Sequence, residues 1–577
     1  MRVEPGPGRT RQLGRGRGGT GPLHHADRPV GVLRRARADR APKTPTRRPG
    51  AQGPTRRPGA QDPHAPTGRP RRPRADQVLP RGRSHVVHSH APAARPDRRL
   101  PATRPRQAGP VLAMAFSVDL RRCQVLGLAG TCVLALGGES AGALPMPDLP
   151  APASARAALG LVGVYFGVVL LIAAWVLLGR LVRGPRPPSP RALLLVLAVW
   201  AAPLLLAPPL FSRDVYSYLA QGAMVDAHLD VYAHGPALLG GPLADEVAPL
   251  WRHTGAPYGP VFLAAASALS GLTRGELPAG LLGMRLLALL GVALMAAVLP
   301  RLARASGADP AAALWLGALN PLVLLHLVAG AHNDALMLGL LGLGLVAAVN
   351  RRPVLGAALV TLAALVKAPA LLGLAAVVVL QVRAGRRPGP SALSTLAAAA
   401  ATTAAATAVA GTGYGWIGAL DTPVSAHNWS PTSLLGRATG ALLDRLGSDL
   451  APLAVPAWHA LGLAVTAAAV AAIWWRLRPR PVYALGLSLA VVAAFGPAIR
   501  PWYALWGLFL IAAAAPSASV RHRMAAVAAV LALAVLPGGG PADTGQLVLA
   551  VSGGALALVV LFQAHQVVRA PALERTA

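Results

Sequence analysis

Residues 157–179 read AALGLVGVYFGVVLLIAAWVLLG and contain no charged side chain. A helix of this length can cross the hydrocarbon core of a bilayer, which takes about 17–25 apolar residues. Similar apolar runs recur along the rest of the sequence, and the whole chain is 54% hydrophobic and only 13% charged. An ordinary soluble protein has about 25% charged residues. The sequence therefore predicts an all-α, polytopic membrane protein with about 13–14 transmembrane helices.

Residues 1–113 have a different composition from the rest of the chain. They hold 26 Lys/Arg against 6 Asp/Glu, which is 20 of the total net charge of +33. Such a Pro-, Gly- and Arg-rich segment buries too little apolar surface to offset its chain entropy, so we expect it to be disordered. One interpretation is a basic arm that binds nucleic acid or anionic lipid. We favour a start at Met114, just before the first apolar segment, with 114–577 as the membrane domain and no nucleic-acid partner.

Basic residues predict which way the membrane domain is oriented, because they prefer the cytoplasmic side. If the apolar segment 259–273 enters the membrane without crossing it, every later Arg cluster lies inside. If that segment crosses fully, all of those clusters move outside, so we predict a re-entrant or surface segment. The clusters placed inside are 121–122, 180–191, 301–304, 351–352, 383–387, 476–480 and 521–523.

The same orientation brings polar segments from distant parts of the sequence to the outer face. Two of them are long loops, 211–258 and 411–453. The others are 331–334, Lys367, 500–502 and 538–544. This convergence predicts an active site on the extracytoplasmic face of the plasma membrane.

The chemistry available to such a site is limited by what the sequence lacks. After Met114 no polar stretch exceeds about 48 residues, whereas a nucleotide-binding domain needs about 100 or more. No phosphate-binding glycine motif follows a strand, and no cysteine or histidine spacing indicates a metal. We therefore expect no cofactor and no metal. An activated sugar would have to come from the membrane, and a polyprenyl-phosphate sugar meets that requirement.

A few charged residues are placed to act on such a donor. Asp214 stands in FSRDVYSYLAQG (211–222), where an apolar run meets the first long loop, and is the candidate catalytic base. Lys367, Arg500 and His332 are candidates for binding the leaving phosphate, since ionisable groups at membrane depth usually have a function. Five aromatic residues are candidates for sugar or acceptor contact: Tyr216, Tyr218, Trp416, Trp429 and Trp502.

Each of these candidates also has a structural interpretation. Asp214 can cap a helix that starts at Val215. Lys367 can extend from a short helix to the interface, and Arg500 can anchor the chain there. His332 can cap the helix that starts near Ala335 together with Asp334. The aromatic side chains can equally belong to the membrane interface.

Several short motifs, in order along residues 120–565, resemble one family. They are DVYSY (214–218), YAHGP (232–236), PYGPVF (257–262), GAHNDALM (330–337), LVKAPALL (365–372), GYGW (413–416), NWSPTS (428–433) and RPWYALW (500–506). The chain thereby resembles the actinobacterial polyprenyl-phosphomannose-dependent α-1,6-mannosyltransferases of the GT-C membrane glycosyltransferase class.

The resemblance implies a function as well as a fold. A GT-C enzyme carries an acidic residue in its first long outer loop, and Asp214 is the matching position. The donor would be polyprenyl-phosphate mannose, and the acceptor a mannosylated glycolipid in the membrane. An inverting transfer to the 6-hydroxyl of mannose would build the α-1,6-mannan of lipomannan-type cell-envelope glycolipids. The basic tail 1–113 departs from the family pattern.

Two other functions compete with this hypothesis. A transporter or lipid flippase would place ionisable groups near the midplane of the bilayer and show internal repeats. Here the charges gather at the outer ends of the helices, which favours an enzyme. A GT-C transferase of another sugar, such as arabinose, remains the second alternative.

Overall fold

The computed structural model describes residues 119–151, 154–420 and 430–573, with side chains as far as residue 566. The chain divides into Met1–Arg104 and Pro105–Ala577, and the first unit lies outside the described residues. The expected tail 1–113 and start at Met114 therefore also lie outside them. Every regular element in the described part of the chain is a helix, which confirms the predicted all-α fold.

By length and apolar composition, six helices of the described chain can cross a membrane. This confirms the predicted multi-pass membrane architecture. Six further apolar helices have only 10–17 residues, and the sequence-based count of about 13–14 spans included short helices of this kind. The six long helices are α1 (Leu120–Ala141), α2 (Ala155–Val182), α8 (Leu277–Ala305), α13 (Pro388–Ala410), α15 (Ala454–Leu477) and α19 (Thr544–Leu573).

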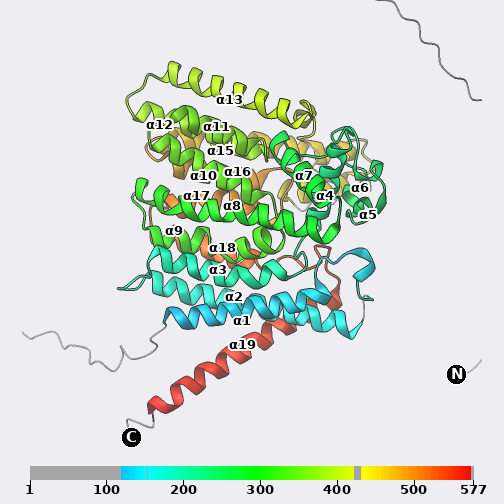
Figure 1. Ribbon diagram of the computed structural model, residues 1–577, viewed down its shortest axis with the longest axis vertical. Helices are drawn as coiled ribbons and strands as arrows, with labels where there is room; N and C mark the ends of the chain where they lie inside the picture. The colour runs from blue at the N-terminus through cyan, green and yellow to red at the C-terminus, as the bar shows by residue number, and fades with distance from the viewer. Residues whose placement is uncertain (1–118, 152–153, 421–429, 574–577) are drawn as a thin grey trace, which may run out of the picture. The chain divides into compact units, whose positions relative to one another are not determined.

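The shorter helices pack between the long ones (Figure 1). Several start with proline at their first position, where the missing N–H is not needed. Ser189, for example, caps α3 by accepting a hydrogen bond from the N–H of Ala192. These helices are α3 (Pro190–Leu206), α7 (Pro260–Thr273), α9 (Pro310–Gly317), α11 (Pro353–Ala364), η5 (Ala368–Leu372), α12 (Gly373–Arg383), α16 (Pro481–Phe495), η8 (Pro501–Tyr503), α17 (Ala504–Ala514) and α18 (Ala518–Leu531).

Glycine lets the first two helices pack with their backbones in contact. A Cβ on Gly167 of α2 would lie 2.6 Å from the carbonyl oxygen of Gly130 in α1. A Cβ on Gly137 of α1 would lie 2.8 Å from the carbonyl oxygen of Gly160 in α2. Small residues at such interfaces are typical of membrane helices, where close van der Waals packing replaces the hydrophobic driving force.

One broken span carries a motif from the resemblance. The π-helix η4 (Val323–Ala329) and the following α10 (Asp334–Val349) are bent by 107°. Ala331 in the break has a φ of 51°, which is unusual for a residue with a side chain. Gly291 of α8 allows α10 to approach, since a Cβ there would lie 2.3 Å from the carbonyl carbon of Ala335. The bend therefore turns His332 and Asp334 into the interior of the protein.

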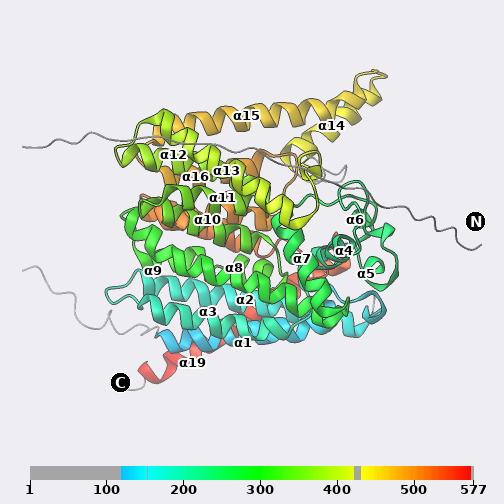
Figure 2. The same ribbon diagram turned by 45° about the horizontal axis from the view of Figure 1, so that its top comes forward.

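The predicted loop 211–258 consists of short helices at one end of the long ones (Figures 1 and 2). Its elements are α4 (Asp214–Asp226), η3 (Pro236–Leu238), α5 (Gly241–Asp245) and α6 (Pro249–Arg252). The predicted loop 411–453 contains η6 (Gly415–Ile417), α14 (Pro431–Arg445) and η7 (Ala451–Leu453), and η2 (Met146–Asp148) joins α1 to α2.

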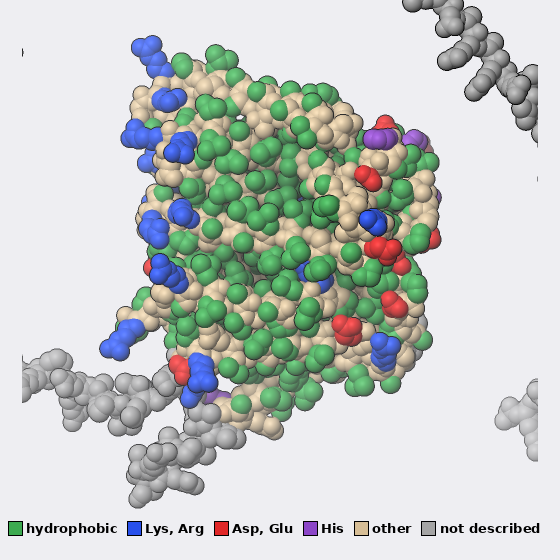
Figure 3. All heavy atoms as spheres, in the orientation of Figure 1, with side chains coloured by type: hydrophobic (Ala, Val, Ile, Leu, Met, Phe, Trp, Pro, Cys, Tyr) green, Lys and Arg blue, Asp and Glu red, His purple; other side chains and the backbone are tan. Residues whose placement is uncertain are grey.

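Charge is distributed unevenly between the two ends of the helices. On the face shown in Figure 3, Lys and Arg gather along one edge, while most Asp, Glu and His side chains lie along the opposite edge. The acidic edge is the one that carries α4, α5 and α6 in Figure 1. This separation agrees with the Arg clusters that the sequence places on a single side.

Candidate functional site

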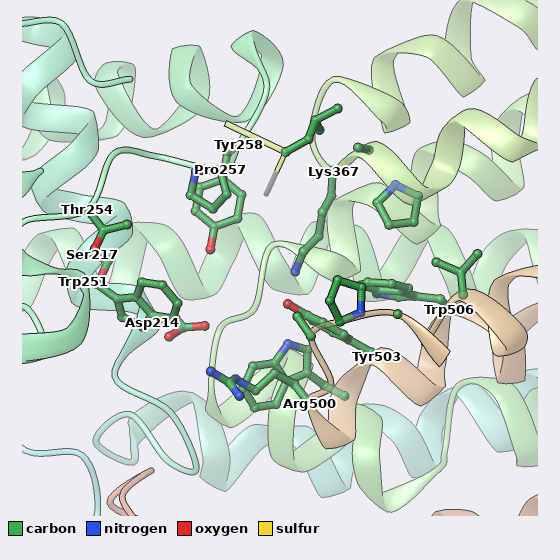
Figure 4. A pocket seen from close by; sticks show the side chains of 18 of the residues that line it. Asp214, Ser217, Trp251, Thr254, Pro257, Tyr258, Lys367, Arg500, Tyr503 and Trp506 are labelled. Carbon is green, nitrogen blue, oxygen red and sulfur yellow. The ribbon is translucent and has the colours of Figure 1, made fainter. Parts of the chain in front are cut away.

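A pocket of about 470 Å³ opens among the shorter helices. Its walls come from segments far apart in sequence: α4, α6 and the chain after it, η5, the end of α16 and η8 with α17. Asp214, Lys367 and Arg500 all line it. In Figure 4 the side chains of these three residues converge on the same space.

Asp214 is the first residue of α4, and its side chain remains 24% exposed. Its backbone N–H donates a hydrogen bond to Ser212 Oγ at 3.1 Å, and no side-chain cap is formed at the preceding Arg213 in the described structure. Arg213 points away from the pocket and pairs with Glu246 at 3.0 Å. The Asp214 carboxylate is therefore held at the pocket wall without a strong ion pair to its sequence neighbour.

The surroundings of Asp214 affect its protonation. The residue lies in the loop helices, outside the membrane-spanning segments. Burial raises the pKa of the Asp214 carboxyl above its ordinary value, and the cations Arg500 and Lys367 oppose that rise. A carboxylate with a raised pKa is a better proton acceptor than an ordinary one, because proton transfer is most efficient when the pKa approaches the working pH.

His332 lies behind Asp214 and is fully buried. Its Nδ1 is 3.8 Å from Asp214 Oδ2 and 3.2 Å from the Tyr218 hydroxyl. Its ring stacks on Trp502 with the centroids 4.0 Å apart. His332 is not among the residues that line the pocket, so it is positioned to support Asp214 and Trp502. It does not face the space where the sequence-based hypothesis expected a phosphate.

Lys367 follows α11 and reaches the pocket from the side opposite α4. Its Nζ donates a hydrogen bond to Asp334 Oδ2 at 2.8 Å, and Trp506 Nε1 donates to Asp334 Oδ1 at 2.5 Å. Asp334 is fully buried, so its carboxylate fixes the ammonium group. An ammonium has three N–H donors, which leaves two for a ligand. The ring of Tyr503, stacked on Trp506, lies 4.8 Å from the ammonium nitrogen.

A close backbone approach keeps Tyr258 beside Lys367. A Cβ on Gly259 would lie 2.4 Å from the carbonyl oxygen of Leu365, so glycine is required at that contact. The N–H of Val261 also donates to the Leu365 carbonyl at 3.2 Å. The PYGPVF and LVKAPALL motifs therefore meet directly, although about 100 residues separate them.

The predicted aromatic residues lie in different places. Trp502 lines the pocket and is 5% exposed. Tyr216 and Tyr218 are buried and do not line the pocket, and the Tyr216 hydroxyl donates to the Ala143 carbonyl at 2.6 Å. Trp416 is partly buried in η6 and is not one of the lining residues. Trp429 lies outside the described residues.

Sequence reasoning missed several residues that line the pocket. Ser217 and Gln221 follow Asp214 on α4 at spacings of three and seven residues, a helical pattern that the sequence displays. Tyr503 and Trp506 belong to the RPWYALW motif. Tyr258 belongs to the PYGPVF motif, but no local pattern signalled Trp251 and Thr254.

Comparison with known proteins identifies two matching family models. Residues 124–383 match "Alpha-(1->6)-mannopyranosyltransferase, N-terminal domain" and residues 432–563 match "MptB C-terminal domain". Alpha-(1->6)-mannopyranosyltransferase A of Mycobacterium tuberculosis is 37% identical over 70% of this chain and 81% of its own length. A probable alpha-(1->6)-mannopyranosyltransferase of Mycolicibacterium smegmatis is 33% identical, over 77% of this chain and 88% of its own.

A third relative extends the similarity to another genus. Alpha-(1->6)-mannopyranosyltransferase B of Corynebacterium glutamicum is 31% identical, over 76% of this chain and 80% of its own length. No solved structure matches the chain. The identity and the coverage confirm the resemblance carried by the motifs, and the chain belongs to the actinobacterial alpha-(1->6)-mannopyranosyltransferase family.

Proposed function

We propose that this protein transfers mannose from polyprenyl-phosphate mannose to the 6-hydroxyl of a mannoside acceptor, with inversion at the anomeric carbon. The observation that carries the proposal is the shared pocket of Asp214, Lys367 and Arg500. It combines a carboxylate with two cations, which is what a proton-abstracting transfer from a phosphate donor requires. Family membership supports the choice of mannose.

The reaction assigns one task to each charged group. Asp214 accepts the proton of the acceptor 6-hydroxyl as its oxygen forms a bond to the donor C1. The bond between C1 and the phosphate oxygen breaks, and its electron pair leaves with polyprenyl phosphate. Inversion requires a β-linked donor to give the α linkage. Lys367 and Arg500 stabilise the negative charge that develops on the leaving phosphate.

The side of the pocket that holds these cations also suits a lipid. Apolar residues of η5 and α16 complete the wall beside Lys367: Pro369, Leu371, Leu372 and Val492. Leu371 is 57% exposed. A polyprenyl chain that leaves the pocket along this wall would contact these apolar side chains. The acceptor is then a mannosylated glycolipid of the same membrane.

The distribution of charge supports an outward-facing site. The Arg-rich ends of the helices prefer the cytoplasm, and the pocket is built by α4, η5 and η8, away from those clusters. We therefore place the reaction on the extracytoplasmic face of the plasma membrane. The product would extend the α-1,6-mannan backbone of lipomannan-type glycolipids.

Transfer by isolated membranes tests the proposal. Membranes containing the protein are given radiolabelled polyprenyl-phosphate mannose and a short α-1,6-mannoside, and labelled product is measured. Loss of the Asp214 base should reduce the rate about 100-fold or more in Asp214→Asn. Asp226→Asn is a matched control, because Asp226 is exposed at the other end of α4 and is not a lining residue.

The same assay separates the competing functions. Normal transfer by Asp214→Asn would contradict the base assignment. Movement of labelled lipid across the bilayer without transfer would favour a flippase. A preference for polyprenyl-phosphate arabinose as donor would contradict the assignment of mannose.

A further inference from the structure

The polar face of α4 continues beyond Asp214 into the pocket. At about 100° per residue, Asp214, Ser217 and Gln221 fall within about 60° of one another around the helix axis. All three line the pocket. On the neighbouring face, Gly222 packs against α7, where a Cβ would lie 2.4 Å from the carbonyl oxygen of Ala266. This contact fixes the rotation of α4, so the polar row must face the pocket.

Ser217 and Gln221 carry polar atoms that lack a partner. The two residues are 4% and 3% exposed. Neither Ser217 Oγ nor Gln221 Oε1 forms a hydrogen bond with the described part of the protein. A buried polar group without a partner destabilises the fold, and most such groups in proteins are paired. Two unpaired atoms in one row, both on the wall of a pocket, indicate a polar ligand that pairs with them.

Helix α6 and the chain that follows it supply the opposite side of this region. Trp251 and Thr254 line the pocket there. The Thr254 hydroxyl donates to the Leu250 carbonyl at 3.0 Å, which leaves its oxygen free to accept. The N–H of Ala256 donates to the Val231 carbonyl at 2.9 Å and ties this segment to the chain that follows α4. A tryptophan together with hydroxyl and amide groups suits a sugar, which has both apolar faces and hydroxyls.

Figure 4 separates the pocket into two regions. Ser217, Trp251 and Thr254 lie on one side of Asp214, while Lys367, Tyr503 and Trp506 lie on the other. The cations and the apolar wall therefore belong to one region, and Ser217, Trp251 and Thr254 belong to the second. Asp214 stands between them, where a base must stand if it takes a proton from an acceptor that attacks a donor.

We propose that Ser217 and Gln221 form the acceptor subsite and bind hydroxyl groups of the mannoside chain. The proposal rests on the mannosyl transfer proposed above. With a rise of 1.5 Å per residue, Ser217 lies about 4.5 Å and Gln221 about 10 Å beyond Asp214 along the helix. Ser217 therefore contacts the sugar whose 6-hydroxyl reacts, and Gln221 contacts the next sugar. The subsite selects acceptors that already contain two linked mannose units.

Separate Michaelis constants for the two substrates test the assignment. The variants are Ser217→Ala and Gln221→Met, which remove the polar atoms with little change in shape. Each should raise the acceptor KM about 5- to 20-fold, as expected for a lost hydrogen bond, and leave the donor KM within about twofold. Gln221→Met should also reduce the preference for α-1,6-mannobiose over methyl α-mannoside, whereas Ser217→Ala should weaken both acceptors equally.

A buried serine elsewhere provides the control. Ser488 is fully buried in α16 and its hydroxyl donates to the Ala484 carbonyl within the same helix. Ser488→Ala should leave both Michaelis constants unchanged. An unchanged acceptor KM in both α4 variants, or an equal rise of donor and acceptor KM, overturns the subsite. Absence of transfer by the unaltered protein is a different result and contradicts the proposed function itself.

Discussion

At the scale of single residues, the site depends on how Asp214 is balanced between burial and nearby cations. Burial favours the neutral acid, while Arg500 and Lys367 favour the carboxylate. Lys367 is also bound to Asp334, which offsets much of its charge. Of the two cations, Arg500 lowers the pKa of Asp214 more. The proposed activity of Asp214 as a base should therefore respond to pH and to the charge of Arg500.

This balance predicts a pH profile. A base works only when deprotonated, so kcat/KM falls as the pH drops through the pKa of Asp214. Because that pKa is raised, the acid limb of the profile, where kcat/KM falls, should lie at a pH above about 3.9, the ordinary pKa of aspartate. Arg500→Gln removes a cation that lowers the pKa, so the limb should move to still higher pH. Transfer rates measured between pH 4 and 9 with purified protein check both shifts.

Exposed Arg274 at the end of α7 provides the control for charge. Arg274→Gln should leave the acid limb where it is. An acid limb that moves to lower pH in Arg500→Gln would contradict the proposed electrostatic coupling. A lower rate without any shift would show that Arg500 acts on the donor alone.

At the scale of elements, the site depends on contacts between helix ends. The start of α7 touches the end of α11 where Gly259 meets the Leu365 carbonyl. This contact sets the distance between the loop that carries Tyr258 and the segment that carries Lys367. Protein interiors are close-packed and transmit strain. A small expansion at this contact therefore displaces both walls of the pocket.

Gly259→Ala should therefore reduce mannosyl transfer about 10- to 100-fold, because misplacement of about 1 Å can have such an effect. Gly271→Ala, in the same helix, is the matched control. Its Cβ would lie 3.4 Å from Asp226 Oδ1, the end of an exposed side chain that can move. Transfer rates and thermal unfolding midpoints in detergent are compared for the two variants. Equal activity of both would mean that the contact does not position the pocket.

The same elements show which features a sequence can predict. Apolar runs predict the helices because, within the membrane, the backbone N–H and C=O groups of each segment must form their hydrogen bonds inside that segment. The position of Asp214 after such a run predicts its place at a pocket wall. The cluster of Asp334, Lys367 and Trp506 joins residues 33 and 172 positions apart, and no local period encodes that pairing. The polar motif around His332 predicts that this residue binds the donor phosphate. The bend after η4, which no local pattern encodes, turns His332 inward.

At the scale of the whole molecule, orientation in the membrane decides which substrates can reach the pocket. The structure separates the Arg-rich edge from the acidic edge (Figure 3). The charge bias of membrane proteins predicts that the Arg-rich edge faces the cytoplasm, as proposed above. The two native cysteines, Cys123 and Cys132, both lie in α1, so a cysteine-free background needs only two substitutions.

Labelling of single cysteines in intact cells therefore tests the orientation directly. Asp245→Cys stands in α5 beside the pocket-bearing loop, and Arg386→Cys follows α12 in an Arg cluster; both native residues are exposed. A membrane-impermeant maleimide should label Asp245→Cys in intact cells and Arg386→Cys only after permeabilisation, because Arg-rich ends of membrane helices prefer the cytoplasm. The reverse pattern would place the pocket inside the cell and exclude an extracytoplasmic donor. Labelling of both cysteine variants in intact cells would contradict the prediction that the Arg-rich face lies on the cytoplasmic side.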